Sequence, residues 1–528
     1  MDRNLAGSAG TSPPDPAVGR VCPLDLSPLA PVVFATPAEV ADAARRARRA
    51  QRAFSELTTR ERIALLRKAA RAMLARRHEI MEIVRVETGK VDIEALFNEA
   101  LGPLDAVHAW TKIVTRHTAR ETVRLNPVSF PGKSAFVDML PRGVVGVIAP
   151  WNFPVAGLYR AVIPALMTGN AVVVKPSPHA PASTAWFVEV LASVLPADVV
   201  GVVQGGADVG EALIGSGIDA CVFTGSPAAG RKVRMQCAER GIPSSIEMGG
   251  KDPAIVLADC DLRRTVAGIT SWALNNAGQA CGAIEIAYVD RAIADAFVER
   301  LASVWKSLRA GPGPRGEVDV APLANRRQFE IVTQHVEDAR ARGAGLVCGG
   351  RPTGTGLWYE PTLLDHCTEE MHVIRDETFG PVLAIVRVDG VSDAVALANQ
   401  SRYGLGASLW TRDVDRAQRI AERLLCGVVT INNHALSGAI PDLPWTGTRE
   451  TGFGVANSRH ALATFVRPKT TVVDRSSGFE LYWLPYDRGL FDLGEALSDA
   501  QIMALDRAWK LPLLLAQRVR RVKRFFAA

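Results

Sequence analysis

Three short segments of the sequence carry side chains that could do chemistry together. Pro150-Trp151-Asn152-Phe153-Pro154 carries an amide, Ile246 to Pro253 (IEMGGKDP) carries the carboxylate of Glu247, and Asn275 to Cys281 (NNAGQAC) ends on a thiol. A cysteine thiolate is the strongest nucleophile that a side chain offers at neutral pH. An amide can donate a hydrogen bond to an oxygen that becomes negatively charged, and a buried carboxylate can act as a general base.

Each of these residues also has a plain structural interpretation. Cys281 could be a small buried hydrophobic residue, as most of the eight cysteines are expected to be. Asn152 could be a turn former between two prolines, and Glu247 could be the end of a strand held in a salt bridge. Taken one at a time, the structural interpretation is our default for Cys281 and Asn152.

The chain that must position these segments has ordinary globular composition. It has 528 residues, of which 48% are hydrophobic and 22% are charged, enough for two to four domains. The net charge of +6 is spread too thinly to predict a nucleic acid as partner. Because the cysteines form no CxxC pair and no zinc-binding spacing with histidine, we expect a reducing, cytoplasmic location and no metal site.

From about residue 140, apolar runs alternate with helical patterns. Strands without polar alternation are buried on both faces, which is typical of a parallel sheet covered by helices. Prolines, asparagines and an arginine interrupt the apolar stretch 143–174, which favours buried strands and a helix over a membrane span. We expect an α/β fold with two sheet-centred domains. The expected strands are Val144–Ile148, Ala171–Val174, Val199–Val203, Ala220–Phe223 and Ala254–Val256, and, in a second alternation over about 260–445, Ile284–Val289, Val382–Val386 and Val428–Ile431.

Helices are expected to fill most of the first hundred residues. Thr36-Pro37-Ala38-Glu39 and Thr58-Thr59-Arg60-Glu61 are capping boxes that start helices ending near Phe54 and Arg77. Gly89 is expected to close a third helix from about residue 78. Residues 1–20 are polar and rich in Pro, Gly and Ser, so we expect a flexible tail without a secretory signal.

One turn has the sequence of a phosphate-binding loop. Phe223 to Gly230 (FTGSPAAG) follows an expected strand and precedes a helical run, and Gly225 and Ser226 suit a phosphate at a helix N-terminus. Upstream, the expected strand Ala171–Val174 ends in Lys175, at the carboxyl end of a parallel strand, where such sheets bind ligands. The one GxGxxG match, Gly311 to Gly316, follows no strand and contains two prolines, so we expect a surface connection there.

Taken jointly, the three reactive segments resemble the signatures of the aldehyde dehydrogenase superfamily. PWNFP, E-[LM]-GGK-x-P, GQ-x-C and E-x-FGP occur here in family order, the last as Glu377-Thr378-Phe379-Gly380-Pro381. The resemblance runs from about residue 21 to 475. It implies an α/β fold in which a Rossmann-like parallel-sheet cofactor domain faces an α/β catalytic domain, with a small β oligomerisation element.

The resemblance also implies a role for each reactive residue. Cys281 would be the nucleophile, ionised beside the aldehyde carbon. The amide of Asn152 and the backbone N–H of Cys281 would bind the oxyanion, and Glu247 would activate the water that hydrolyses the thioester. Relatives that pass the acyl group to coenzyme A as a rule lack this glutamate, so a non-acylating enzyme that releases a free carboxylic acid is expected.

For the cofactor, the resemblance places six residues around an NAD(P) molecule. Many NAD-preferring relatives carry Glu three residues after the Lys, whereas this chain has Pro178, so repulsion of a 2′-phosphate is weakened. We expect NAD, with NADP also possible. Ile286 and the 444–452 segment also depart from the family pattern, on the substrate side. The expected cofactor-binding residues are Lys175, Ser226, Gly225, Trp151, Glu377 and Phe379.

The resemblance further divides the chain into domains and implies a homodimer or homotetramer, because an exposed edge strand near 465–474 must pair with another chain. The expected parts are a tail over 1–20, an NAD(P)-binding domain over 21–122 and 139–249, a catalytic domain over 250–447, an oligomerisation element over 123–138 and 463–475, and a C-terminal extension over 476–528.

Two alternatives to a general aldehyde dehydrogenase remain open at this point. A semialdehyde dehydrogenase, for example one for succinate semialdehyde, would need a basic side chain in the substrate tunnel to bind the distal carboxylate. A non-catalytic binding protein on the same fold would be expected to have lost the nucleophile or its supporting residues, and all of them are present.

The C-terminal extension lies outside the family core. From Arg507 it has seven basic residues and no acid. Leu515, Val519, Val522 and Phe526 fall on one face of an expected helix, with basic residues, Arg518 among them, around it. Such a basic amphipathic helix could contact an anionic membrane surface or pack across its own or a partner subunit.

Overall fold

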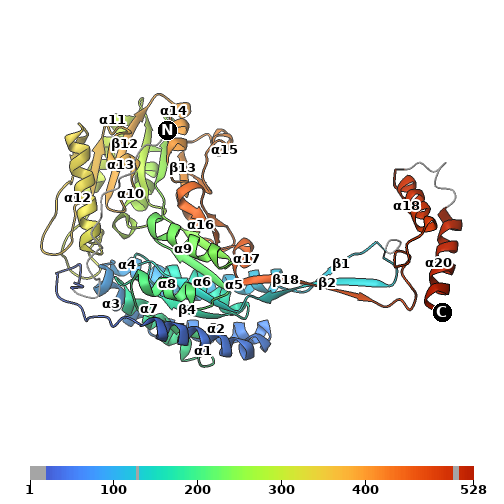
Figure 1. The fold of residues 1–528 in the computed structure, drawn as a ribbon. Helices are drawn as coiled ribbons and strands as arrows, with labels where there is room; N and C mark the ends of the chain where they lie inside the picture. The colour runs from blue at the N-terminus through green and yellow to red at the C-terminus, as the bar shows by residue number, and fades with distance from the viewer. Residues whose placement is uncertain (1–18, 127–129, 503–510, 528) are drawn as a thin grey trace, which may run out of the picture. The chain divides into compact units, whose positions relative to one another are not determined.

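The computed structural model describes residues 19–126, 130–502 and 511–527. The chain divides into two units, Met1–Ala119 with Leu140–Arg467 and Arg120–Met139 with Pro468–Ala528 (Figure 1). The predicted tail over 1–20 lies almost wholly outside the described residues. The first unit contains two sheets and every residue that the sequence analysis assigned to the reaction.

The first sheet has six strands in the order β16-β7-β6-β3-β4-β5. All of its described pairings are parallel except that of the short edge strand β16 with β7. Every residue of β3 and β4 is buried, as their continuous apolar sequences predict. The strands are β3 Val144–Ile148, β4 Ala171–Lys175, β5 Val200–Val202, β6 Ala220–Thr224, β7 Ser244–Glu247 and β16 Gly452–Phe453.

Helices cover this sheet, and α1 and α2, blue in Figure 1, run along its outer side. Both predicted capping boxes are formed, at Thr36 and at Thr58, and Gly89 ends α3 with a left-handed φ of 76°. These helices are α1 Pro37–Glu56, α2 Thr59–Ala75, α3 Arg77–Thr88, α4 Asp92–Glu94, the π-helical η1 Ala95–Leu101, α5 Gly102–His117, α6 Ala156–Met167, α7 Pro181–Ala192, α8 Ala207–Gly215 and α9 Pro227–Glu239.

The second sheet has seven strands in the order β10-β11-β12-β9-β8-β13-β14, parallel apart from β10. The predicted run Ala254–Val256 belongs to this sheet rather than to the first alternation, because it pairs with Ala287–Val289 and Ser408–Trp410. The strands are β8 Asp252–Val256, β9 Ile284–Asp290, β10 Gly345–Cys348, β11 Thr362–Asp365, β12 Val382–Val388, β13 Gly406–Trp410 and β14 Val428–Ile431.

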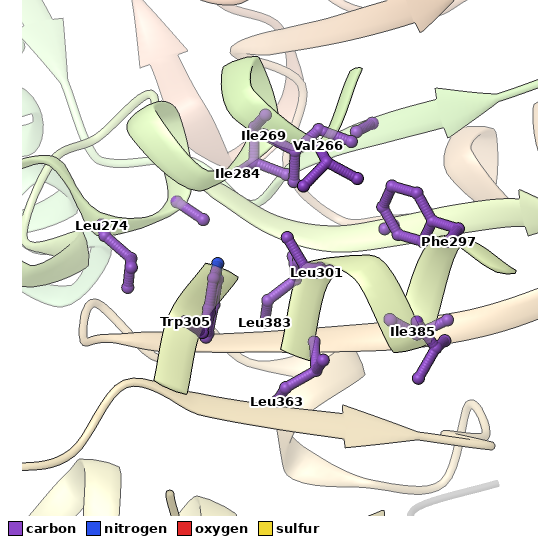
Figure 2. Close-up of a cluster of buried hydrophobic side chains, with 14 of the residues drawn as sticks. Val266, Ile269, Leu274, Ile284, Phe297, Leu301, Trp305, Leu363, Leu383 and Ile385 are labelled. Atoms are coloured by element: carbon purple, nitrogen blue, oxygen red, sulfur yellow. The ribbon is translucent and has the colours of Figure 1, made fainter. Parts of the chain in front are cut away.

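The core of the second sheet lies between its strands and two helices. Figure 2 shows Phe297, Leu301 and Trp305 of α11 facing Leu383 and the other apolar residues of the sheet. The helices on this sheet are α10 Leu262–Leu274, α11 Ala294–Ser307, α12 Arg326–Ala341, α13 His372–Arg375, α14 Val391–Gln400 and α15 Val414–Ala421.

Short elements connect the two sheets around the site. Gly311 to Gly316 is an exposed connection with no helix after it, so the rejection of this GxGxxG match is confirmed. The short elements are η2 Asn275–Gly278, α16 Leu436–Ala439, β15 Trp445–Thr446, η3 Arg449–Thr451, β17 Val455–Ala456, η4 Arg459–Ala461 and α17 Leu462–Phe465.

The second unit contains most of a three-stranded sheet and a helical pair. The sheet order is β1-β2-β18, from β1 Glu121–Val123, β2 Lys133–Pro141 and β18 Val466–Asp474. α18 Arg488–Gln501 contacts α20 Leu511–Ala527. No helix among the described residues is long and apolar enough to cross a membrane.

The expected arrangement of the C-terminal helix is wrong at Arg518. Its side chain was placed among the solvated basic residues, but it is 2% exposed, because backbone carbonyls and Asp487 satisfy its guanidinium. Val522 is buried beside it, whereas Val519 and Phe526 of the expected apolar face are exposed. Arg507 itself lies outside the described residues.

Candidate active site

One cavity of about 1030 Å³ lies within the first unit, between the ends of its two sheets. Strands β4, β6 and β7 of the first sheet end at its wall, and the segment after η2 and the segment before β12 complete the wall from the second sheet. All nine residues that the sequence analysis proposed line this single cavity: Cys281, Glu247, Asn152, Lys175, Ser226, Gly225, Trp151, Glu377 and Phe379.

The turn before Cys281 has an unusual backbone. Asn276, Ala277 and Gly278 have φ values of 52°, 54° and 72°, three left-handed residues in succession. A Cβ on Gly278 would lie 2.0 Å from the carbonyl oxygen of Gly380, so only glycine fits there. This turn directs the chain into the cavity and leaves Cys281 partly accessible.

The thiol of Cys281 is electrostatically close to Glu247. Burial, followed by the Glu247 carboxylate, raises the pKa of Cys281 well above its usual value, and Arg160 opposes this shift. The sequence analysis expected an ionised sulfur, whereas burial and the neighbouring carboxylate both disfavour the thiolate form of Cys281. The carboxylate is placed where it can take the thiol proton.

Glu247 is the last residue of β7 and has no ion pair among the described residues. Its Oε1 is buried and has no hydrogen-bond partner in the described part of the chain. The strand-end salt bridge considered from sequence is therefore not formed. A buried acceptor left free beside a thiol is an arrangement that suits a general base more than a structural carboxylate.

Asn152 is held by its backbone as well as by its side chain. Its carbonyl accepts from Lys90 Nζ at 2.9 Å and from Asn276 Nδ2 at 3.0 Å. Its Nδ2 donates to the carbonyl of Gln279 at 3.0 Å, which uses one amide hydrogen and leaves the other available. The nucleophile's segment and the amide are thus joined in one hydrogen-bond network.

Buried charges that sequence reasoning missed support this network. Lys90 and Glu99, both fully buried, form an ion pair at 2.9 Å. Glu99 Oε2 also accepts from the backbone N–H groups of Val155 and Ala156 at the start of α6. Glu94 accepts from the N–H of Asn276 at 2.7 Å, and burial raises the pKa of Glu94 to about 7. Nothing in their local spacing indicates these long-range contacts.

The part of the cavity where the sequence analysis expects the cofactor is formed by two strand ends of the first sheet. Lys175, at the end of β4, donates to the carbonyls of Pro176 and Gly205 at 2.8 Å, and burial lowers the pKa of Lys175 to about 8. Ser226 caps α9 by accepting from Ala229 N. A Cβ on Gly225 would lie 2.7 Å from the Phe223 ring, so a larger residue here would displace that ring.

Glu377 and Phe379 approach the cavity from the segment before β12. Glu377 Oε1 accepts from Gly250 N at 3.0 Å, and burial raises the pKa of Glu377 to about 8. Phe379 has a left-handed φ of 51° and meets Trp151 edge to face, with ring centroids 5.5 Å apart. A ring pair and a carboxylate therefore form one wall of the cleft.

A buried glutamate of β9 fixes this wall and was also missed from sequence. Glu285 accepts from the N–H groups of Thr378 and Phe379, both at 2.8 Å. Lys251 Nζ pairs with it at 2.5 Å, and both side chains are almost fully buried. A charged residue between the apolar residues Ile284 and Ile286 was the available signal, because a buried carboxylate needs specific partners.

The remaining wall of the cavity is largely apolar and contains one cation. Tyr159, Trp272, Trp445 and Phe465 line it together with Arg160. Arg160 Nη2 donates to the carbonyl of Gly438 at 2.7 Å, its one hydrogen bond among the described contacts. The guanidinium has five N–H donors, so it can still bind a ligand.

Comparison with known proteins gives the class of this protein. The model of the aldehyde dehydrogenase family matches residues 12–471. The chain belongs to the aldehyde dehydrogenase family, and it is an NAD(P)-dependent oxidoreductase that acts on an aldehyde. The predicted family and fold class are confirmed.

The particular relatives differ in substrate. The chain is 34% identical over 471 residues to a 4,4′-diapolycopene aldehyde oxidase of Methylomonas, covering 89% of this chain and 88% of that protein. It is 32% identical to the succinate semialdehyde dehydrogenase of Acinetobacter baylyi, covering 79% and 85%. A Bacillus halodurans NADP-dependent glyceraldehyde-3-phosphate dehydrogenase, solved with NADP, aligns with a TM-score of 0.81 and 34% identity over 86% of this chain and 95% of that one.

Proposed function

We propose that this enzyme oxidises its aldehyde to a free carboxylic acid through a covalent intermediate on Cys281. The observation that carries the proposal is the pairing of a partly accessible thiol with a carboxylate, Glu247, whose Oε1 has no hydrogen-bond partner among the described residues. Asn152 is fixed beside them by the Lys90 and Asn276 contacts. These are a nucleophile, a base and an oxyanion donor on one cavity wall.

The residues would act in two half-reactions. Cys281 Sγ bonds to the aldehyde carbon as its proton passes to Glu247, and the carbonyl oxygen becomes an oxyanion near Asn152 Nδ2. When bound, NAD(P)+ accepts the hydride that leaves this carbon, and a thioester remains on Cys281. Glu247, having released its proton to solvent, then takes a proton from water as the water oxygen bonds to the acyl carbon. The carbon–sulfur bond breaks, the acid leaves, and the Cys281 sulfur regains a proton from Glu247.

The cavity fits the dinucleotide that this reaction requires. Gly225 leads from β6 into the N-terminus of α9, and Lys175 lies at the end of β4, which is separated from β6 by β3 in the same sheet. Glu377 and Phe379 line the same cavity as Cys281. In this proposal the phosphate and ribose side is held by Lys175 and Ser226, and the nicotinamide side by Glu377, Phe379 and Trp151.

We further propose NAD as the cofactor, with NADP accepted. Pro178 lines the cavity three residues after Lys175 and offers no carboxylate to repel a 2′-phosphate. Pro178→Glu is expected to raise KM for NADP at least tenfold and to change KM for NAD little. Equal KM values for NADP in the wild type and the variant would place the 2′ position elsewhere.

A semialdehyde substrate is the second candidate, favoured by one observation. Arg160 lines the cavity, has spare donors and lies close enough to lower the pKa of Cys281. A distal carboxylate could bind its guanidinium while the aldehyde reaches the sulfur. The expected signature is a KM that is at least tenfold lower for an ω-carboxylate aldehyde than for a neutral aldehyde of equal length, lost in Arg160→Met.

The proposals for the oligomeric state and the cellular location rest on the free edge of β18 and on the free cysteines. We propose a homodimer or homotetramer in which β18 pairs through its outer edge, and a cytoplasmic location in keeping with eight free cysteines. A non-catalytic binding protein is a poor alternative, because the site keeps a nucleophile, a base and an oxyanion donor.

The direct test uses stopped-flow mixing of aldehyde with the enzyme and either cofactor. A burst of NAD(P)H is expected from the wild type, and Cys281→Ala is expected to lose at least 10³-fold in kcat with normal thermal unfolding. A Cys281→Ala variant that retains normal dehydrogenase activity would overturn the covalent mechanism. A panel of short, long, aromatic and ω-carboxylate aldehydes in the same assay would identify the substrate class.

A further inference from the structure

The C-terminal extension of the second unit exposes an unusual amount of apolar surface. Of the 25 large hydrophobic side chains exposed in the described chain, 12 lie between residues 479 and 526. This segment is about a tenth of the chain and yet carries nearly half of them. A concentration of this size indicates a surface that another body covers.

A buried arginine organises this surface. The guanidinium of Arg518 donates to the backbone carbonyls of Leu481, Trp483 and Pro485 at 2.6–3.0 Å and to the Asp487 carboxylate at 3.0 Å. Its side chain is 1% exposed. The loop over 481–487 is therefore fixed through its backbone onto α20, and the burial of a charge is compensated by four hydrogen bonds.

Because the backbone of this loop faces Arg518, its side chains face outward. Tyr482, Trp483, Leu484 and Tyr486 are 58%, 46%, 60% and 73% exposed. Their exposure is thus a consequence of specific hydrogen bonding rather than of a loop without contacts. We call these four residues the apolar loop.

Aromatic residues at the end of α20 add to the apolar surface. Phe526 stacks on Phe479 with ring centroids 5.0 Å apart and meets Phe525 edge to face at 5.2 Å. All three rings are between 42% and 56% exposed. The cluster is ordered by its own ring contacts and still presents aromatic edges to the outside.

The charge on α20 has one sign. Residues 511–526 contain five basic side chains and no acidic one. Arg518 and Arg521 pair with Asp487, whereas Arg520, Lys523 and Arg524 are exposed and have no ion pair among the described contacts. Three unpaired cations therefore lie on the helix that carries the aromatic cluster.

We propose that the apolar loop, the aromatic cluster and these three cations bind the surface of an anionic lipid bilayer. Trp, Tyr and Phe favour the membrane interface, and Lys and Arg near an anionic surface are attracted to it electrostatically. A second copy of this chain is the other occupant to consider. Symmetric pairing of this surface with the same surface of a second copy would bring cations against cations, so binding of a second copy is disfavoured.

The test is co-sedimentation of the full-length protein with sonicated vesicles of phosphatidylcholine alone or with 30% phosphatidylglycerol. The bound fraction is expected to be at least fivefold greater on the anionic vesicles and to fall when NaCl is raised from 0.1 to 0.5 M. Two variants of this surface are expected to bind anionic vesicles at least tenfold less, with unchanged aldehyde turnover. They are the double variant Trp483→Ser/Tyr486→Ser and the triple variant Arg520→Glu/Lys523→Glu/Arg524→Glu.

Matched controls change exposed residues in the first unit. Val33→Ser/Met235→Ser removes exposed apolar surface, and Arg49→Glu/Arg52→Glu/Arg60→Glu reverses the same number of charges; both are expected to bind vesicles like the wild type. Equal loss in the controls and the surface variants would overturn the proposal, as would no binding of the wild type. If the wild type does not bind vesicles and the surface variants have a smaller oligomeric mass than the wild type by light scattering, the surface would be assigned to a second copy instead.

Discussion

At the scale of single residues, the relation between Cys281 and Glu247 decides what this site can do. The carboxylate is close enough to raise the pKa of the thiol, so in the proposed mechanism the sulfur loses its proton to Glu247 as it bonds to the substrate. Reactivity is then coupled to occupancy of the site, and a free thiolate is avoided.

This relation predicts the effect of Glu247→Gln on the thiol itself. Removal of the negative charge is expected to lower the pKa of Cys281, so alkylation by iodoacetamide at pH 7 becomes several-fold faster than in the wild type. The midpoint of the alkylation rate against pH gives the pKa directly. Glu377→Gln, a neutralised carboxylate of the same cavity, is the control and should leave that midpoint unchanged; an unchanged midpoint in Glu247→Gln would contradict the pairing.

Glu377 predicts a pH dependence of stability. Its pKa is raised from an ordinary 4.5 to about 8 by burial, so the folded protein holds a proton that the unfolded chain has released. Stability is therefore lost as the pH rises from about 4.5 to about 8, by at most about 1.4 kcal/mol per pH unit.

The neutral variant Glu377→Gln keeps an acceptor for Gly250 N and lacks this loss. Its melting temperature is expected to equal that of the wild type at pH 5 and to exceed it by several degrees at pH 8.5. The exposed Glu211→Gln serves as the control for a general charge effect. Parallel curves for wild type and Glu377→Gln would show that the carboxyl ionises freely in the folded state.

At the scale of elements, the turn at η2 fixes where Cys281, the proposed nucleophile, lies. Gly278→Ala would combine a left-handed backbone with a Cβ 2.0 Å from the carbonyl oxygen of Gly380. We expect a loss of about 3 kcal/mol in stability and at least a 100-fold loss in kcat. Gly217→Ala has a similar φ of 86° but open space around its Cβ, so it measures the backbone strain alone, about 1 kcal/mol. Similar effects of both substitutions on kcat would contradict the positional role of the turn.

Local sequence was enough to predict several elements. β3 and β14 have the predicted bounds, and the capping boxes start α1 and α2 at Pro37 and Thr59. These elements follow from short-range chemistry: uninterrupted apolar runs and reciprocal hydrogen bonds within four residues. β7, by contrast, has the sequence Ser-Ser-Ile-Glu and was not among the expected strands, although Glu247 was considered as a possible strand end, because its pairing with β6 comes from the rest of the sheet.

The residues of the candidate site also divide into those that the sequence predicted and those that it did not. Residues within contiguous motifs could be proposed from the family pattern, and all of them line the cavity. Lys90, Glu94, Glu99 and Glu285 could not, because, apart from the Lys90–Glu99 pair, the contacts that tie them to the site join residues 34 to 182 positions apart. Long-range ion pairs leave no local periodicity from which they could be inferred.

At the scale of the whole molecule, β18 is the last strand of its three-stranded sheet, so its outer edge has unpaired backbone groups in the described structure. Exposed edges of this length favour pairing with another chain. Light scattering on the purified protein is expected to give a mass of two or four chains. A monomer at micromolar concentration would contradict the proposed assembly.

The central claim is that an acyl group passes through Cys281 and leaves with the help of Glu247. The most direct measurement is intact-protein mass spectrometry of Glu247→Gln after mixing with aldehyde and NAD(P)+, with Glu247→Gln/Cys281→Ala as the matched control. We predict an added mass equal to the acyl group, stable for minutes and absent from the double variant. An unmodified Glu247→Gln protein that has nevertheless produced one equivalent of NAD(P)H and free acid would contradict the role of Glu247 as the deacylating base.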